Sequence, residues 1–269
     1  MVKKNYKISV LITNFNKLKF LKKTILSIIN QNYKNYEIIL FDDCSTDGST
    51  IIAKELAKKK KFKIIINKKK KFKSSPLNQI YGILESFKKS KGEIICLLDG
   101  DDYFYPKKLY KINQYFEKEK NMKSVFNYPK FDKSNFNFKK RDRKNIWPTI
   151  FPTSCISIRR SNFKKFIKLI KPRNYSCLEI DARFIIFSKF YNNEYNLINN
   201  QLTKYNNDKN GITSNVKKFS KKWWLRRNQA YEYLKYILNF KKTKLGYTLD
   251  IIITSLLVLY RLFEDSTVL

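Results

Sequence analysis

The chain has 269 residues, of which 43% are hydrophobic and 16% aromatic, and its formal net charge is +35. This composition indicates a folded globular protein with one large domain, or one domain with an appendage. The sequence contains no histidine, which excludes Ser-His-Asp and Cys-His catalysis, the His-Glu-x-x-His metalloproteases and any histidine base. A general base must therefore be Asp, Glu, Lys or Tyr, and a metal must be held by oxygen, which favours Mg²⁺ or Mn²⁺.

The positive charge comes mostly from lysine and is spread along the chain. A charge of this size usually indicates nucleic acid or an anionic membrane as a partner. Because the lysines accompany many Asn, Ile, Phe and Tyr residues, the bias is as typical of a whole proteome as of a binding surface. We still expect such a surface to attract acidic lipids and phosphorylated ligands. The four cysteines form no C-x-x-C pair, so we expect free thiols.

Short apolar runs alternate with amphipathic segments in the first hundred residues. The runs that predict buried strands are Ile8–Ile12, Glu37–Phe41, Phe62–Ile66 and Glu93–Leu98. Apolar residues at helical spacing predict helices between them, over about 18–29, 52–57 and 77–87. This β-α-β-α-β-α-β order is typical of an α/β fold with a doubly wound, mainly parallel sheet flanked by helices.

The second hundred residues predict a less regular mixture of elements. Pro106 is placed well to begin a helix that carries Leu109, Ile112 and Phe116. The expected elements that follow are a strand at Val125–Tyr128, a long loop at Lys130–Trp147, a strand at Ser154–Ile158, helices over 163–170 and 180–191, a hairpin of Tyr195–Ile198 with Gln201–Tyr205, and a polar loop at Asn207–Asn215.

The character of the chain changes from Lys217 onward. A basic, aromatic helix is predicted around Trp224–Leu238, followed by the apolar stretch Ile251–Phe263, which Arg261 interrupts. This stretch is shorter than the roughly 20 residues that a membrane-spanning helix needs. Attachment to a membrane surface and packing on the protein's own sheet are both consistent with this pattern.

Two groups of carboxylates follow predicted strands. Asp42 and Asp43 end the second strand, and Asp99, Asp101 and Asp102 surround a glycine at the end of the fourth. Ligands of open α/β sheets bind at the carboxyl ends of strands, and a divalent cation would offset the repulsion among these acids. If the two strands are neighbours, both groups face one crevice. The alternative is an acidic turn before a helix.

The phosphate-binding glycine motifs are absent. The chain has neither G-x-x-x-x-G-K-[ST] nor G-x-G-x-x-G, so a metal would carry more of the contact to phosphates. A nucleotidyltransferase would need a basic, glycine-rich loop after the first strand, and the segment Thr13–Asn16 is not one.

An ordered set of motifs resembles the family 2 glycosyltransferases with the GT-A fold. The resemblance covers about 7–110 closely and continues weakly to about 215. The motifs are Ile8–Ile12, Asn16, Ser27, Gln31, Glu37, Asp42-Asp43-x-Ser45-Thr46-Asp47-Gly48, Gly92-Glu93, Leu98-Asp99-x-Asp101-Asp102 and Pro106. It implies a glycosyltransferase domain over 1–215, with a nucleotide-sugar-binding half at 1–105 and an acceptor half at 106–215. A C-terminal helical region would occupy 216–269.

The resemblance also implies an activity, namely inverting transfer of a hexose-like sugar from a nucleotide-diphosphate-sugar to an acceptor hydroxyl. Asp101, with Asp102 in support, would hold Mg²⁺ or Mn²⁺ through the diphosphate. Asp42 or Asp43 would contact the nucleoside, and Asp99 the ribose or sugar. The implied donor-binding residues together are Thr13, Asn16, Asp42, Asp43, Asn78, Asp99 and Gly100.

The family keeps an acidic pair where this chain has Glu179-Ile180-Asp181. We expect Asp181 to be the catalytic base, with Glu179 as the second candidate. The alternative is that these acids only favour the first turn of a helix. Burial near an acidic crevice would raise the pKa of such a base.

The sequence departs from the family pattern at several positions. Thr13 stands where the family often has Pro, and Leu77 where it often has Arg, so a contact to the diphosphate is lost or passes to Lys73. The acidic pair is split by Ile180. The Gln-x-x-Arg-Trp motif of processive synthases is absent, since Trp223–Arg227 does not match it.

We therefore expect a metal-dependent, non-processive transferase in the cytoplasm, peripheral on the inner face of the cell membrane. It would use a UDP-sugar and a cell-envelope or lipid-linked saccharide, with an anionic membrane surface as a further partner and without nucleic acid. The alternative is a basic protein that binds RNA or anionic membrane and keeps the fold without catalysis.

Overall fold

The computed structural model describes residues 4–131, 151–171, 174–206, 208, 211–212, 216–241 and 249–266. Its strands are β1 (Ile8–Asn14), β2 (Tyr36–Asp43), β3 (Lys63–Asn67), β4 (Ile94–Asp99), β5 (Tyr103–Phe104), β6 (Ser124–Lys130), β7 (Ile156–Arg159) and β8 (Leu197–Lys204). Its α-helices are α1 (Leu18–Ile29), α2 (Ser49–Lys60), α3 (Ser75–Lys89), α4 (Lys108–Lys118), α5 (Arg160–Leu169), α6 (Ile180–Ile186), α7 (Lys221–Phe240) and α8 (Leu249–Ser266). A 3₁₀ turn, η1 (Thr153–Cys155), precedes β7, and a π-helical turn, η2 (Phe187–Tyr191), continues α6.

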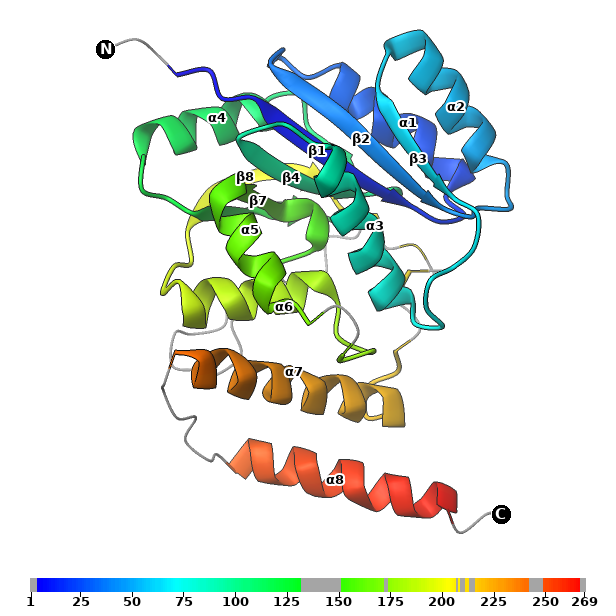
Figure 1. Cartoon of the computed structure of the whole chain (residues 1–269), viewed down its shortest axis with the longest axis vertical. Coiled ribbons are helices and arrows are strands. Elements are labelled where there is room, and N and C mark those ends of the chain that lie inside the picture. Colours follow the sequence, from blue (N-terminus) through cyan, green and yellow to red (C-terminus); the bar gives the residue numbers. More distant parts are fainter. Residues whose placement is uncertain are drawn as a thin grey trace.

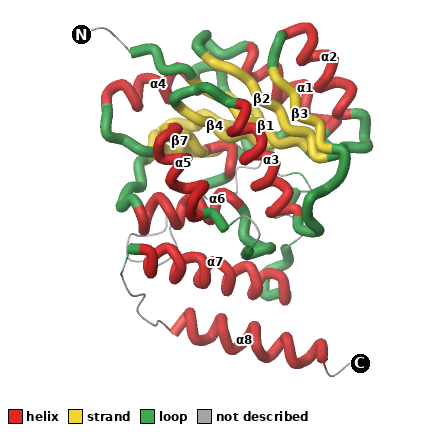
Figure 2. Tube along the Cα trace, viewed as in Figure 1, coloured by secondary structure: helices red, strands yellow, loops and turns green. Residues whose placement is uncertain are grey.

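One sheet of eight strands runs through the molecule in the order β3-β2-β1-β4-β7-β6-β8-β5. The strands β3, β2, β1 and β4 are mutually parallel, which confirms the α/β pattern of the first hundred residues. Beyond β4 the sheet is mixed, because β7 is antiparallel to both β4 and β6, whereas β8 is parallel to β6 and antiparallel to β5. Figure 2 shows this sheet surrounded by helices.

Both faces of the sheet are covered because neighbouring residues of a strand point to opposite faces. In β1, Val10 and Ile12 lie in a core with α1, α2 and α4, whereas Leu11 lies in a second core with α3, α5, α6 and α7. All three side chains are fully buried. This double burial explains why the parallel strands are read as continuous apolar runs in the sequence.

The expected hairpin at Tyr195–Tyr205 is wrong, because a single strand, β8, occupies Leu197–Lys204. Its pairing with β6 jumps from Ile198 opposite Asn127 to Gln201 opposite Tyr128, so two asparagines bulge out of the ladder. Polar residues in a bulge imitate the signal of a turn. The expected loop at Lys130–Trp147 lies outside the described residues from 132 onward, and the one at Asn207–Asn215 is described only at 208 and 211–212.

The C-terminal helices lie in succession below the sheet domain in Figure 1. The helix α7 packs on α6 and η2, and its Tyr233, Leu234 and Ile237 are fully buried in the core. The next helix, α8, packs on α7 through its buried Ile251 and Thr254. Within the described ranges, no helix combines the length and apolarity needed to cross a membrane.

Candidate active site

The loops that follow β1 and β4 are joined by a backbone contact at Gly100. The amide of Gly100 donates to the carbonyl of Thr13 at 2.8 Å. A Cβ added at Gly100 would lie 2.8 Å from Asn14 Oδ1 and 3.1 Å from the Thr13 carbonyl oxygen, so only glycine allows the loops to approach this closely. The carboxylates on either side of Gly100 are thereby held against the end of β1.

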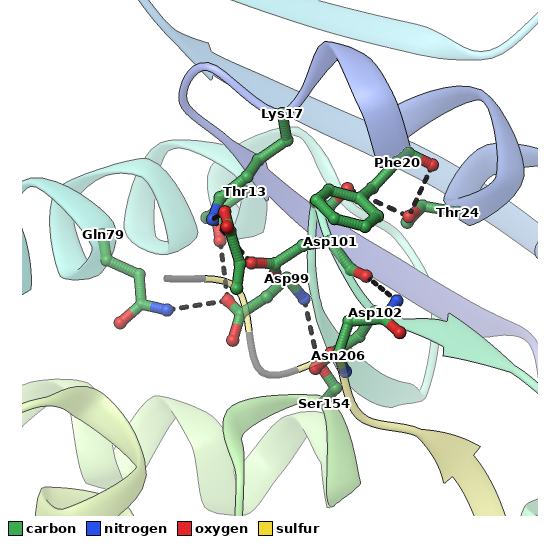
Figure 3. A network of polar contacts seen from close by, with 12 residues as sticks. Thr13, Lys17, Phe20, Thr24, Gln79, Asp99, Asp101, Asp102, Ser154 and Asn206 are labelled. Carbon is green, nitrogen blue, oxygen red and sulfur yellow. Dashed lines mark hydrogen bonds and ion pairs between the residues drawn. The ribbon is translucent and has the colours of Figure 1, made fainter. Parts of the chain in front are cut away.

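Asp99 is the last residue of β4 and is fixed by three hydrogen bonds. Its Oδ1 accepts from Gln79 Nε2 at 2.7 Å and from Thr13 Oγ1 at 3.2 Å, and its backbone amide donates to Ser154 Oγ at 3.0 Å (Figure 3). Burial, together with the negative charge of Asp101, raises the pKa of the Asp99 carboxyl to about 6. Asp99 is therefore a positioned carboxyl group that faces the cleft.

Asp101 and Asp102 differ in their surroundings. Asp101 pairs with Lys17, whose Nζ lies 2.6 Å from Asp101 Oδ2. Asp102 is 1% exposed, and its Oδ1 accepts from the backbone amide of Asn206 at 2.8 Å. Burial, and then the charges of Asp101 and Asp99, raise the pKa of Asp102 well above its ordinary value. Asp101 thus faces the cleft, and Asp102 supports the loop from behind.

Of the two acids at the end of β2, Asp42 is buried and Asp43 lines the cleft. The sequence predicted a shared crevice on the condition that β2 and β4 are neighbours. They are not neighbours, because β1 lies between them. Asp42 is fully buried and accepts hydrogen bonds from Asn14, Ser45 and Thr50, which brace the β2–α2 loop. Asp43 lines the same cleft as Asp99, so the crevice is still shared.

Two predicted donor-binding asparagines hold loops in place. Asn16, with a φ of 52°, accepts the Thr46 amide at 2.8 Å. Asn78 binds both backbone groups of Phe72, with distances of 2.8 and 2.9 Å, and also lines the cleft. Asn16 does not line the cleft, so its contact to the β2–α2 loop is structural.

The predicted acidic pair lies at the start of α6 and lines the same cleft as Asp99. Glu179 is 4% exposed and pairs with Arg226 of α7, with 2.6 Å between Glu179 Oε2 and Arg226 Nε. Asp181 is partly buried and accepts the backbone amide of Ala182 at 2.6 Å. Burial and the nearby Glu179 carboxylate raise the pKa of Asp181 to about 7, and the charge of Arg226 limits that increase.

A cleft of about 850 Å³ brings these residues together. This volume lies in the range of pockets that enclose small organic ligands. Of the residues predicted from the sequence, those that line it are Thr13, Asp43, Asn78, Asp99, Gly100, Asp101, Glu179 and Asp181. Asn16, Asp42 and Asp102 do not line it.

The cleft also contains residues that the sequence did not indicate. Lys17 contacts Asp101, and Gln79 contacts Asp99. Asp208, which follows β8, also pairs with Lys17. Lys222 and Arg226 reach the cleft from α7. Sequence patterns gave no signal for them, because each acts through a long side chain or a contact distant in the sequence.

The side chains around Asp101 fit a divalent cation only if substrate and water supply most of its oxygen ligands. Among the residues that the structure describes, no three His, Cys, Asp or Glu side chains converge as a metal cluster. The carboxylate at the loop's exposed side is Asp101, and Asp102 lies behind it. Mg²⁺ and Mn²⁺ sites of this kind use one or two carboxylates and take their remaining ligands from substrate phosphates and water. The residues present therefore fit a cation that arrives with a diphosphate.

The sheet order and the cleft at the carboxyl ends of β1, β2 and β4 define the GT-A fold of glycosyltransferases. The structure aligns with residues 1–349 of Staphylococcus aureus TarS, crystallised with UDP-GlcNAc, at a TM-score of 0.64 and 13% identity, over 94% of this chain and 70% of that one. It also aligns with the mannosyltransferase PcManGT of Pyrobaculum calidifontis, crystallised with GDP-Man and Mn²⁺, at a TM-score of 0.58 and 11% identity, over 94% and 69%. At such identities the similarity concerns the fold.

The chain belongs to glycosyl transferase family 2, whose family model matches residues 9–195. It is 36% identical over 121 residues to the putative glycosyltransferase EpsE of Bacillus subtilis, and these residues are 44% of this chain and 41% of EpsE. It is 39% identical over 97 residues to the cholesterol galactosyltransferase of Borreliella burgdorferi, over 36% and 25% of the two chains. The match thus spans less than half the length of these relatives.

Proposed function

We propose that this chain is an inverting, metal-dependent, non-processive glycosyltransferase that moves a sugar from a nucleotide-diphosphate-sugar to a hydroxyl of a cell-envelope or lipid-linked saccharide. The observation that carries the proposal is the single cleft that contains Asp99, Asp101 and Asp181. Family membership supports sugar transfer in general. The solved neighbours support the class of donor, with a UDP-sugar first, because they hold UDP-GlcNAc, UDP and GDP-Man.

Asp181 is the proposed base. Inversion is one displacement, in which the acceptor oxygen attacks the anomeric carbon opposite the leaving diphosphate and loses its proton to a base. A carboxyl with a pKa of about 7 is ionised often enough near neutral pH to accept that proton, and basic enough to hold it. Glu179 is the second candidate, but its ion pair with Arg226 occupies one of its oxygens.

The donor is proposed to lie along the ends of β1, β2 and β4. Asp43 would contact the nucleoside and Asp99 the ribose or sugar, within reach of Thr13 and Gly100. Asp101, with Asp102 behind it, would hold Mg²⁺ or Mn²⁺. When bound, that cation would offset the charge that builds on the leaving diphosphate.

Among the donor-side residues, we propose that Asp42, Asn16 and Asn78 act through the loops that they hold. Asp42 and Asn16 fix the β2–α2 loop, and Asn78 fixes the segment before α3. These loops carry the side chains that would surround the nucleotide, so the three residues are proposed as positioning residues for donor binding.

We propose the inner face of the cell membrane as the place of action. The outer face of α8 presents a row of exposed apolar side chains, namely Leu249, Ile252, Ile253, Leu256, Leu259 and Tyr260. A helix whose exposed side is apolar, on a chain of net charge +35, suits the surface of an anionic bilayer. The acceptor would then be presented from the membrane.

We further propose a division of the chain into three parts. Residues 1–105 would bind the donor, 106–215 would bind the acceptor, and 216–269 would add the C-terminal helices.

The test is a panel of nucleotide-sugars incubated with the protein and Mn²⁺. We expect hydrolysis or transfer from at least one donor, and a product whose anomeric configuration, read by NMR, is opposite to that of the donor. Asp101→Asn and Asp181→Asn should each abolish most turnover. Glu55→Gln, an exposed acid on α2, serves as the matched control and should retain full activity.

The alternative is a basic protein that binds RNA or anionic membrane and keeps the fold without catalysis. Six acidic side chains line the cleft, namely Asp43, Asp99, Asp101, Glu179, Asp181 and Asp208. They argue against a phosphate-binding surface at this position, because carboxylates repel phosphates unless a cation intervenes. A wild-type protein that neither binds nor turns over any nucleotide-sugar of the panel would favour the alternative.

A further inference from the structure

The carboxylate expected to take a metal already has a cation beside it. Lys17 Nζ lies 2.6 Å from Asp101 Oδ2 and 2.6 Å from Asp208 Oδ2, so one ammonium bridges two carboxylates from different loops. The exposed fractions of these side chains are only 13%, 13% and 16%. Figure 3 shows Lys17 extending from the β1–α1 loop toward Asp101.

The backbone of Lys17 is fixed at this position. Its carbonyl accepts from the amides of Phe20 and Leu21, at 2.9 and 2.8 Å, and so begins α1. The carboxylates of Asp101 and Asp208 each lie 2.6 Å from its ammonium and favour the charged form. The ammonium therefore stays charged and remains within reach of Asp101.

We infer that Lys17 is an internal counter-ion that competes with the divalent cation for Asp101 and moves to the diphosphate when the donor binds. The inference rests on the proposed metal-dependent function. It adds to that function a coupling between the metal and the donor that originates in Lys17.

The coupling follows from charge balance. A divalent cation that arrives alone competes with the ammonium for Asp101 and places a second positive charge beside it, and Lys17 then keeps Asp208 as its carboxylate partner. A diphosphate that arrives with the cation provides new negative partners for the ammonium in the same cleft. Displacement of Lys17 is therefore unfavourable for the metal alone and favourable when metal and donor bind together. Coupling of this kind is reciprocal, so the metal must raise donor affinity by the same factor.

The experiment measures Mn²⁺ binding to the full chain by electron paramagnetic resonance, with and without UDP or GDP, whichever the donor panel selects. The quantity of interest is the ratio of the Mn²⁺ Kd without nucleotide to the Kd with it. Lys17→Met removes the charge and keeps most of the side-chain volume. Lys17→Arg keeps the charge. Lys22→Met is the matched control, because Lys22 is an exposed lysine of α1 that does not line the cleft.

We expect Lys17→Met to bind Mn²⁺ about tenfold more tightly than wild type without nucleotide, which is the effect of losing one charge-assisted contact. Its Kd ratio should fall by about the same factor or more, because Lys17 no longer assists the diphosphate. Lys17→Arg and Lys22→Met should keep the wild-type ratio. Calorimetric titration with the nucleotide, with and without Mn²⁺, must return the same ratios.

An unchanged ratio in a folded Lys17→Met protein would overturn the inference and leave the proposed function intact. So would weaker Mn²⁺ binding by that variant in the absence of nucleotide. If the wild type binds the nucleotide but never Mn²⁺, both the inference and the metal dependence of the proposed function fail. Thermal melting establishes that each variant is folded, and Lys17→Gln replaces Lys17→Met if the latter is not.

Discussion

The acid limb of the pH–rate profile tests the assignment of Asp181 as the base. The active form is the carboxylate, so kcat/KM should rise with pH through a pKa of about 7. About nine tenths of the groups are ionised at pH 8 and about one tenth at pH 6, so kcat/KM should fall about tenfold between these values. Asp181→Asn should lower kcat by about 10²- to 10⁴-fold.

Two neighbouring substitutions should move this limb in opposite directions. The Glu179 carboxylate raises the pKa of Asp181, so Glu179→Gln should shift the limb to lower pH. The Arg226 guanidinium lowers it, so Arg226→Gln should shift the limb to higher pH. The assay is initial-rate kinetics at low donor concentration over pH 5–9 in buffers of constant ionic strength.

Lys235→Gln is the matched control, because Lys235 lies on α7 like Arg226 but pairs with Glu232 at the surface. It should leave the limb in place. A limb that moves in the same direction in the Glu179 and Arg226 variants, or in neither, would refute the assignment. So would a profile that Asp181→Asn scales down without removing its limb near pH 7, as distinct from a limb near pH 6 that Asp99 contributes.

Three further predictions follow from the loops and from α8. Asp101→Asn should lower Mn²⁺-stimulated kcat/KM at least about 100-fold, measured with the donor from the panel. Gly100→Ala should destabilise the fold by about 1–3 kcal/mol in urea unfolding, because its Cβ would meet Asn14 Oδ1 at 2.8 Å. Leu256→Asp combined with Leu259→Asp should lower binding to phosphatidylglycerol vesicles about tenfold or more in cosedimentation, with little binding to phosphatidylcholine by either protein.

The first half of the fold could be predicted because its signals are local. Strands buried on both faces give continuous apolar runs, and the intervening helices give apolar positions at helical spacing. The pattern failed at β8, where Asn199 and Asn200 are exposed in the middle of the strand. A bulge and a turn present the same polar residues, and only the partner strand β6 distinguishes between them.

The site could be predicted to the extent that the fold places it. Carboxylates at the ends of parallel strands must lie at one edge of the sheet, so Asp43 and Asp99 could be brought together from the sequence. Which of two adjacent acids faces the cleft depends on side-chain packing, and the sequence left Asp42 and Asp43 equivalent. The contacts of Lys17 with Asp208 and of Arg226 with Glu179 join residues that are 191 and 47 positions apart in the sequence, and no local pattern encodes them.

The two C-terminal helices should differ in what their removal does. Deleting 242–269 removes α8, whose buried side chains, among those that the structure describes, are Ile251 and Thr254, so the remaining protein should stay folded. Deleting 216–269 also removes Tyr233, Leu234 and Ile237 from the core that α7 shares with α3, α5 and α6. At about 1.5–3 kcal/mol for each buried side chain, this loss of roughly 5–9 kcal/mol is comparable to the whole stability of a typical domain. The shorter protein should therefore fail to show a cooperative thermal transition by circular dichroism, while the longer one retains it. If 1–215 folded cooperatively by itself, the domain would not need α7 or the ion pair of Arg226 with Glu179 for its stability, and the reasoning above would be wrong.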